Sequence, residues 1–147
     1  MNKYILLDFD GVITSKTYTW KCYRDGARAN IYGLDWFDPN CIEALRHIVE
    51  NTGAKIVVSS SWRDLRIEQL RKLWEDIPMP GELVGTTPVW ILTKKEAIEH
   101  WIKQHTDDRY VILDDADLGL DYQIRTDPYI GLVEEDAEKA IKLLNTL

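Results

Sequence analysis

Acidic side chains occur in two tight clusters, and each cluster follows an apolar run of the chain. Asp8 and Asp10 follow residues 4–7, and Asp114 and Asp115 follow residues 111–113. Crowded carboxylates repel one another unless a cation screens them. Mg²⁺ prefers oxygen ligands, and one or two carboxylates with several waters are enough to bind it. The two clusters therefore indicate a Mg²⁺ site if the fold brings them together.

Groups that suit a phosphate lie between the acidic clusters. Arg63 comes after three consecutive hydroxyl residues, which are Ser59, Ser60 and Ser61. A hydroxyl at a strand end, backbone amides at the next helix start and a guanidinium can all hold phosphoryl oxygens. Lys94 and Lys95 stand where a helix is expected to begin, a position that is unfavourable for a cation unless acids lie near it. Each group alone also fits a helix cap, a surface ion pair or an exposed lysine. Together they predict Mg²⁺-assisted phosphoryl transfer through an aspartate.

The elements that must position these groups alternate between strands and helices. Apolar runs predict strands at residues 4–7, 55–59 and 110–113, with shorter strands at 82–85 and 122–126. Helices are predicted from Asp38 to Gly53, over residues 64–74, from Thr93 onward and near the C-terminus. This alternation predicts an α/β fold with one doubly wound parallel sheet. Function in such sheets lies beyond the carboxyl ends of the strands, where Asp8, Ser59 and Asp114 fall.

Residues 14–33 lack helical periodicity, and we interpret them as a flap, with a hairpin as one form. The segment is basic and aromatic, with one acid, Asp25, among Lys16, Lys21, Arg24, Arg28, Tyr18, Trp20 and Tyr23. Such a flap could contact a nucleic-acid strand by stacking and phosphate pairing, or it could simply shield the site.

The composition is that of one soluble globular domain over residues 1–147. A net charge of −7 disfavours general attraction to nucleic acids or membrane surfaces. Cys22 and Cys41 form no CxxC motif, so we expect two reduced thiols in a cytoplasmic protein. No apolar run has the length of a signal-peptide core or a membrane span, so no membrane association is expected.

Taken in order, these motifs resemble the haloacid dehalogenase (HAD) superfamily of phosphohydrolases. That family carries DxD after the first strand, Ser or Thr after the second, Lys before a helix and an acidic pair after the fourth strand. More narrowly, DFDGVI, SSSWR, the Lys-x-Glu-Ala-Ile stretch and VILDD resemble the HAD domain of Swiss army knife RNA-repair proteins. The resemblance implies a HAD-like Rossmannoid core, and the short spacings between motifs leave no room for a large cap.

The resemblance implies a role for each acidic residue. Asp8 would be the nucleophile that forms an aspartyl-phosphate. Asp10 would protonate the leaving oxygen and then activate water, which requires a tuned environment. Asp8, the backbone carbonyl of Asp10 and Asp114 would hold Mg²⁺, with Asp115 assisting.

The resemblance also implies which groups bind phosphate. Ser59 best matches the hydroxyl motif, and Ser60 is the alternative. Lys94 fits the motif lysine better than Lys95, because it precedes Glu-Ala-Ile by one residue. Arg63 is a further phosphate-binding candidate.

An uncapped site suits large substrates, such as nucleic-acid 3′-phosphate ends or phosphoproteins. One alternative is a phosphatase for small molecules such as nucleotides or sugars. Another is a receiver-type phosphoacceptor domain, although receivers place the acidic pair early and the lysine late. A catalytically silent scaffold agrees least with the intact set of residues. The sequence does not predict an oligomeric state.

Overall fold

A computed structural model describes residues 1–26, 36–59, 66–91 and 93–146 of the chain. The core is a five-stranded sheet with the order β3-β2-β1-β4-β5, and every pairing is parallel. The strands are β1 Lys3–Leu7, β2 Lys55–Val58, β3 Leu83–Thr86, β4 Arg109–Asp114 and β5 Gln123–Arg125. The helices are α1 Lys16–Arg24, α2 Pro39–Thr52, α3 Ile67–Asp76, α4 Lys94–Lys103 and α5 Glu134–Asn145.

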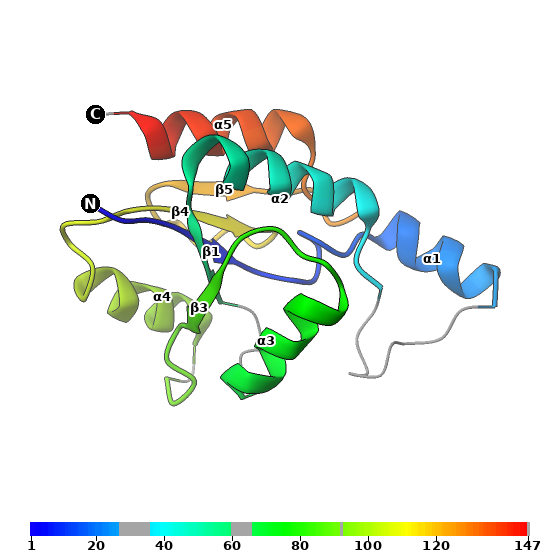
Figure 1. The fold of residues 1–147 in the computed structure, drawn as a ribbon, viewed down its shortest axis with the longest axis horizontal. Coiled ribbons are helices and arrows are strands. Elements are labelled where there is room, and N and C mark those ends of the chain that lie inside the picture. The colour runs from blue at the N-terminus through cyan, green and yellow to red at the C-terminus, as the bar shows by residue number, and fades with distance from the viewer. Residues whose placement is uncertain (27–35, 60–65, 92, 147) are drawn as a thin grey trace.

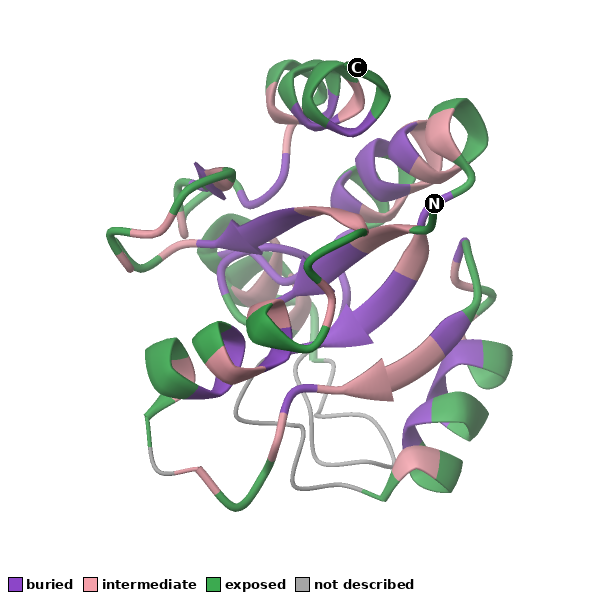
Figure 2. Cartoon of the chain, turned by 90° about the vertical axis from the view of Figure 1, so that its left-hand side faces the viewer, coloured by how far each residue is buried: buried purple, intermediate pink, exposed green. Residues whose placement is uncertain are grey.

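Helices cover both faces of the sheet, as Figure 2 shows. Alternate residues of a strand point to opposite faces, so each strand contributes to two cores. Leu6, Val57 and Ile112 pack against α4 through Ile98 and Trp101. The strand residues of opposite parity form a larger core with α2, α3 and α5. The predicted doubly wound α/β fold is confirmed, and the described residues form no large cap.

The ends of α2 lie where the sequence predicts them. The Asp38 carboxylate accepts a hydrogen bond from the backbone N–H of Asn40 at 2.9 Å, which caps the first turn. Gly53 ends the helix in the left-handed region, with φ of 71°, which a residue with a side chain adopts only at a cost. Helix α3 lies slightly later than predicted, over 67–76 rather than 64–74, and residues 64 and 65 lie outside the described part.

The interpretation of residues 14–33 as a non-helical flap is wrong for its first half. Residues 16–24 form helix α1, and the Ser15 hydroxyl caps it by accepting the backbone N–H of Tyr18 at 3.2 Å. None of the residues of α1 is buried, so it needs no apolar stripe, and its sequence carries no helical periodicity. Figure 1 shows α1 projecting from the side of the sheet. Residues 27–33 of the predicted flap, including Arg28, lie outside the described residues.

The two ends of the described chain lie close together at the amino edge of the sheet (Figure 1). The ammonium group of Lys3 in β1 donates a hydrogen bond to the side-chain oxygen of Asn145 in α5 at 2.8 Å. The backbone N–H of Asn2 donates to the Asp108 carboxylate at 3.0 Å. In the part of the chain that the structure describes, no helix has both the length and the apolar character needed to cross a membrane.

Candidate active site

Four polar residues stand side by side at the carboxyl ends of four neighbouring strands. We call Asp114, Asp8, Ser59 and Thr87 the polar row. Asp114 ends β4, and the other three directly follow β1, β2 and β3. The backbone continues the sheet between them: Asp8 N–H donates to Leu113, Ser59 N–H to Leu7 and Thr87 N–H to Val58, at 2.9 to 3.0 Å. All four side chains are buried.

The side chains of the polar row belong to the face of the sheet that α4 covers. Asp8, Ser59 and Asp114 come two residues after Leu6, Val57 and Ile112, which pack against α4. Residues two apart on a strand point to the same face. Thr87 stands two residues after Gly85, which pairs with Val57. The first residue of α4, Lys94, can therefore reach the row from above.

Lys94 bridges the two buried carboxylates of the row. Its ammonium nitrogen lies 3.0 Å from Asp114 Oδ2 and 3.3 Å from Asp8 Oδ2. The other oxygen of each carboxylate accepts a backbone N–H, from Phe9 to Asp8 and from Ala116 to Asp114, both at 2.9 Å. These contacts fix both carboxylates at the carboxyl edge of the sheet.

Negative charge exceeds positive charge at this position, and the pKa values reflect it. Burial, followed by repulsion from Asp114, raises the pKa of Asp8 to about 7, although Lys94 opposes the shift. Burial and the charge of Asp114 also raise the pKa of Asp115. Burial works against the charge of Lys94, but Asp8 and Asp114 outweigh it and raise its pKa. The three carboxylates therefore carry more negative charge than Lys94 can balance.

A divalent cation would balance this excess of negative charge. Carboxylate oxygens of Asp8, Asp114 and Asp115 all lie within 4.8 Å of one another. Oxygen ligands on opposite sides of one Mg²⁺ lie about 4.2 Å apart, because each Mg–O bond is about 2.1 Å. The three residues can therefore hold the ion after a small closure, and they are oxygen donors of the type that Mg²⁺ prefers.

A second group of possible metal ligands, His47, Glu134 and Glu138, lies on α2 and α5, away from the polar row. Its members are exposed or half-buried, and His47 Nε2 already lies 2.6 Å from the Glu138 carboxylate. It lacks the burial of the first group.

The loop after β1 is shaped around Asp115. Gly11 has φ of 81°, a region that favours glycine. A Cβ added there would lie 2.3 Å from Asp115 Oδ2, so only glycine lets this carboxylate approach the loop. The hydroxyl of Thr126 donates to the Gly11 carbonyl at 2.7 Å and holds the loop from the side of β5.

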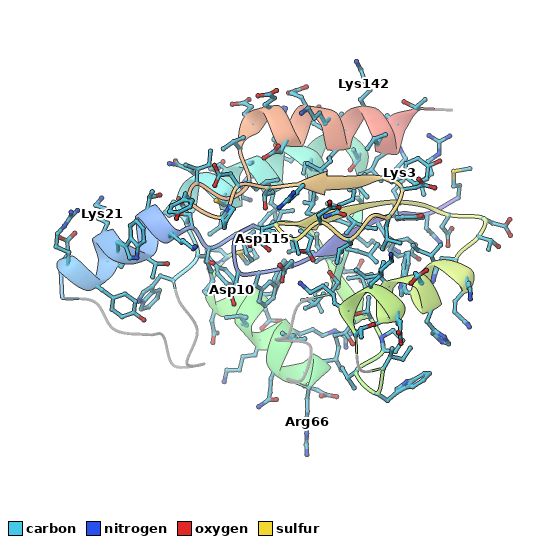
Figure 3. The ribbon with its side chains drawn as sticks, turned by 180° about the vertical axis from the view of Figure 1, so that it is seen from behind. Lys3, Asp10, Lys21, Arg66, Asp115 and Lys142 are labelled. Atoms are coloured by element: carbon cyan, nitrogen blue, oxygen red, sulfur yellow. The ribbon has the colours of Figure 1, made fainter. Side chains whose placement is uncertain are left out.

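Asp10 lies at the mouth of the site rather than among the three carboxylates. Its side chain is exposed, and the Thr14 hydroxyl donates to its Oδ1 at 3.4 Å. Asp10 and Asp115 line one hollow of about 210 Å³, which α1 borders with Lys16 and Trp20. Figure 3 labels both carboxylates near the middle of the molecule. Asp10 can therefore meet a substrate oxygen that enters from solvent.

The Ser59 hydroxyl is buried and has no hydrogen-bond partner among the described residues. Burying an unpaired hydroxyl costs roughly 1–3 kcal/mol. A buried hydroxyl without a protein partner therefore commonly forms a hydrogen bond to a ligand or to water. Ser59 stands next to Asp8 in the polar row, where a phosphoryl oxygen would satisfy it. Ser60, Ser61 and Arg63 lie outside the described residues.

Thr87 has the same property, and the sequence analysis missed it. Its hydroxyl is buried and also has no partner within the described part of the chain. The signal was present, because a threonine directly follows the predicted strand around 82–85, as Ser59 follows β2. Lys95, the alternative to Lys94, is exposed.

Comparison with known protein families agrees with this geometry. Residues 4–137 match the family described as the HAD domain in Swiss Army Knife RNA repair proteins. The chain belongs to this family. No curated protein and no solved structure gives a significant match to it.

Membership places this HAD domain in a superfamily of phosphohydrolases, as the resemblance of its motifs implied. The order of motifs along the HAD domain also separates it from receiver domains. A divalent metal is typical of the superfamily, and the three clustered carboxylates are the residues able to hold it.

Proposed function

We propose that this HAD domain is a Mg²⁺-dependent phosphohydrolase that acts through an aspartyl-phosphate on Asp8. The observation that carries the proposal is the cluster of Asp8, Asp114 and Asp115 around Lys94, beside the unpaired hydroxyl of Ser59. Together these residues offer the proposed nucleophile, ligands for a cation and donors for phosphate oxygens at the carboxyl edge of the sheet.

In the first step, a carboxylate oxygen of Asp8 attacks the phosphorus and the ester P–O bond breaks. Asp10 gives its proton to the departing oxygen. In the second step, Asp10 takes a proton from water, which attacks the phosphorus and releases inorganic phosphate and the Asp8 carboxylate. Ser59 and Lys94 hold the phosphoryl oxygens in both steps. When bound, Mg²⁺ would neutralise charge on the transferring group.

We propose large phosphorylated substrates, specifically nucleic-acid 3′-phosphate ends. Two features support this. The described residues form no large cap over the polar row, and the family takes its name from RNA repair proteins. A panel of 3′-phosphorylated oligonucleotides, phosphopeptides, mononucleotides and sugar phosphates would test the choice. Turnover confined to mononucleotides or sugar phosphates would favour the small-molecule alternative.

The two aspartates can be separated with 4-nitrophenyl phosphate, whose leaving group needs no acid. Asp8→Asn should release no nitrophenol, because the nucleophile is gone. Asp10→Asn should release about one equivalent in a burst and then turn over slowly, because hydrolysis of the aspartyl-phosphate needs the base. Stopped-flow absorbance measures both.

As a matched control, Asp117→Asn removes an exposed carboxylate from the loop after β4 and should keep full turnover. Full activity in Asp8→Asn would contradict the mechanism. A burst in Asp8→Asn equal to that in Asp10→Asn would contradict the assignment of the nucleophile.

A further inference from the structure

A groove runs from the hydroxyl end of the polar row along α4. It has a volume of about 440 Å³ and lies between α4 and residues 86–90. This volume is within the range of small-ligand clefts, roughly 300–1,000 Å³. None of the described residues that line the groove is acidic, although the chain carries a net charge of −7. By contrast, a larger hollow along α2 is lined by Asp38, Glu43, Glu50 and Glu134.

Thr87 is one of the residues that line this groove. Its hydroxyl is buried and has no partner among the described residues, so an occupant would reach it only after a local opening of the groove wall. A wholly apolar ligand would leave the hydroxyl unsatisfied. We therefore expect the groove to bind an occupant that carries polar atoms on its own edge.

Aromatic side chains form the rest of the groove. Trp90 is 72% exposed, and its ring meets His100 edge to face at 5.3 Å. Trp101 and His105 stack on each other at 3.8 Å deeper in the wall. The Trp101 carbonyl accepts from His105 Nδ1–H at 2.7 Å, which leaves Nε2 of a neutral His105 as an acceptor. Gln104 adds an amide to the lining.

Flat aromatic faces with hydrogen-bonding groups at their edges match a nucleobase. A base has a π-face for stacking and donors and acceptors on its edge. It is also uncharged, so it needs no acidic partner in the groove. An apolar peptide side chain would use the rings but would make no hydrogen bond to Thr87 or Gln104. The chemistry of the lining thus favours a heterocycle.

The groove is within reach of the phosphate site. Thr87 and Asp8 stand two strands apart in the polar row, which is roughly 10 Å at the strand spacing of a sheet. Ser59 lies between them. A nucleotide whose phosphate sits at Asp8, Ser59 and Lys94 can therefore place its base at the Thr87 end of the groove, which Trp90 also lines.

We propose that this groove, lined by Thr87, Trp90 and His100, binds the base of the nucleotide that carries the phosphate. This inference rests on the proposed phosphohydrolase function and specifies its substrate: an unstacked terminal nucleotide, bound by its base as well as by its phosphate. The groove contributes to recognition, whereas Asp8 and Asp10 carry the chemistry.

The first test compares two 3′-phosphorylated dinucleotides, one with its terminal base and one abasic at that position. Wild type should favour the intact substrate by about tenfold in kcat/KM, because one base–aromatic stack has roughly that effect. Trp90→Ala should lose the preference, and Trp90→Phe should keep most of it. The kcat/KM for the abasic substrate should be nearly the same in wild type and Trp90→Ala, because that substrate has no base for Trp90 to stack on.

Tyr122→Ala is the matched control, because Tyr122 is an exposed aromatic residue beside β5, at the opposite edge of the sheet. It should keep the full preference for the base. Equal kcat/KM for the intact and abasic substrates in wild type would overturn the proposal, as would an equal loss of preference in Tyr122→Ala and Trp90→Ala.

Thr87→Val tests the buried hydroxyl separately. The substitution preserves shape and removes an unpaired polar group, so the urea midpoint of unfolding should stay the same or rise. The preference for the intact substrate should fall. A lower midpoint with an unchanged preference would assign Thr87 a structural role only and would overturn its place in the groove.

A binding measurement distinguishes failure of this proposal from failure of the proposed function. In Asp8→Asn, a 3′-phosphorylated dinucleotide with terminal 2-aminopurine should lose fluorescence on binding, and the further variant Trp90→Ala should abolish that quenching. If wild type fails to hydrolyse 4-nitrophenyl phosphate, the phosphohydrolase proposal is wrong. Trp90-dependent quenching would still support the groove, and its absence would overturn it.

Discussion

Lys94 is, among the described residues, the cation that contacts both Asp8 and Asp114. Its single charge cannot balance these two carboxylates together with Asp115. The pKa of Asp8, raised to about 7 by burial and then by Asp114, expresses this imbalance. The proposed role of Asp8 as the nucleophile requires its ionised form, which the raised pKa disfavours at neutral pH in the metal-free protein. A bound cation would favour the ionised form.

Mg²⁺ affinity should therefore depend on pH. Below pH 7 the metal-free protein holds a proton on Asp8, and the ion must displace it. Affinity should rise by up to tenfold per pH unit between about 5.5 and 7 and level off above 7. Isothermal titration calorimetry in buffers of different ionisation enthalpy would measure both the affinity and the released proton.

Asp117→Asn is the control for this titration and should keep the same pH profile, because Asp117 is exposed and outside the cluster. A Mg²⁺ affinity that stays constant from pH 5.5 to 7 would contradict the raised pKa of Asp8.

The free energy of unfolding of the metal-free protein should also depend on pH, because the pKa of Asp8 differs between the folded and unfolded states. In EDTA, Asp8 contributes stability fully below pH 3.8 and loses it as pH rises through 7, because the folded state holds the extra proton.

At the residue scale, the sequence predicted the groups that have strong chemical signatures. Asp8, Asp114 and Lys94 stand at the ends of recognisable elements, and the structure brings them into contact. The sequence analysis missed Thr87 because a threonine after a short strand is common. Only its burial, which the structure shows, marks it as a candidate. Whether a hydroxyl is paired depends on the neighbouring strand, which sequence spacing does not reveal.

Side-chain hydrogen bonds cap the first turns of α1, α2 and α4. The Ser15 hydroxyl caps α1 and also donates to the Asp38 carboxylate at 2.7 Å. Asp38 in turn caps α2, so one buried pair joins the starts of two helices. The Thr93 hydroxyl accepts the Glu96 N–H and caps α4, the helix that begins with Lys94. Thr93 is exposed, and its hydroxyl makes no second hydrogen bond to another described residue.

Ser15→Ala should therefore cost more stability than Thr93→Ala. We expect a loss of about 2 kcal/mol for Ser15→Ala, because the cap is lost and Asp38 loses a buried donor. Thr93→Ala should cost about 1 kcal/mol. Urea unfolding measures both values. Equal losses would contradict the coupling of α1 to α2 through Asp38.

At the element scale, prediction from sequence followed burial. Helix α2, which has an apolar stripe, was predicted near its observed bounds, and the helix predicted near the C-terminus is α5. Helix α1 was not predicted, because none of its residues is buried and periodicity therefore gives no signal. Its capping residue, Ser15, was the remaining clue. The strand order also had to come from the structure, since parallel strands that pair, such as β1 and β4, lie about a hundred residues apart.

The chain is acidic, and its described residues form no large cap over the polar row; both features fit the proposed recognition of a chain end rather than of a long strand. A net charge of −7 repels a polyanion beyond the few groups held at the site. The aromatic groove along α4 offers contact to one base. Under the proposed function, we expect these features to limit the footprint on a nucleic acid to the terminal nucleotide.

Substrate length should then matter little. The kcat/KM values for a 3′-phosphorylated dinucleotide and a 20-mer should agree within about threefold. A plot of log kcat/KM against log salt concentration should have a slope near −1, because only one or two phosphates are neutralised. Steady-state assays at several salt concentrations measure both. A tenfold gain with length, or a slope steeper than about −4, would indicate an extended binding track.

The hydrogen bond between Lys3 and Asn145 has an evolutionary consequence. Because the ends of the fold meet away from the polar row, a short peptide could join them, and new ends could open in the exposed turn at Thr106 and Asp107. Such a circular permutant would carry its acidic pair first and its lysine last along the chain, with the same site in space. The chemistry of the site therefore does not itself require this order of motifs along the chain.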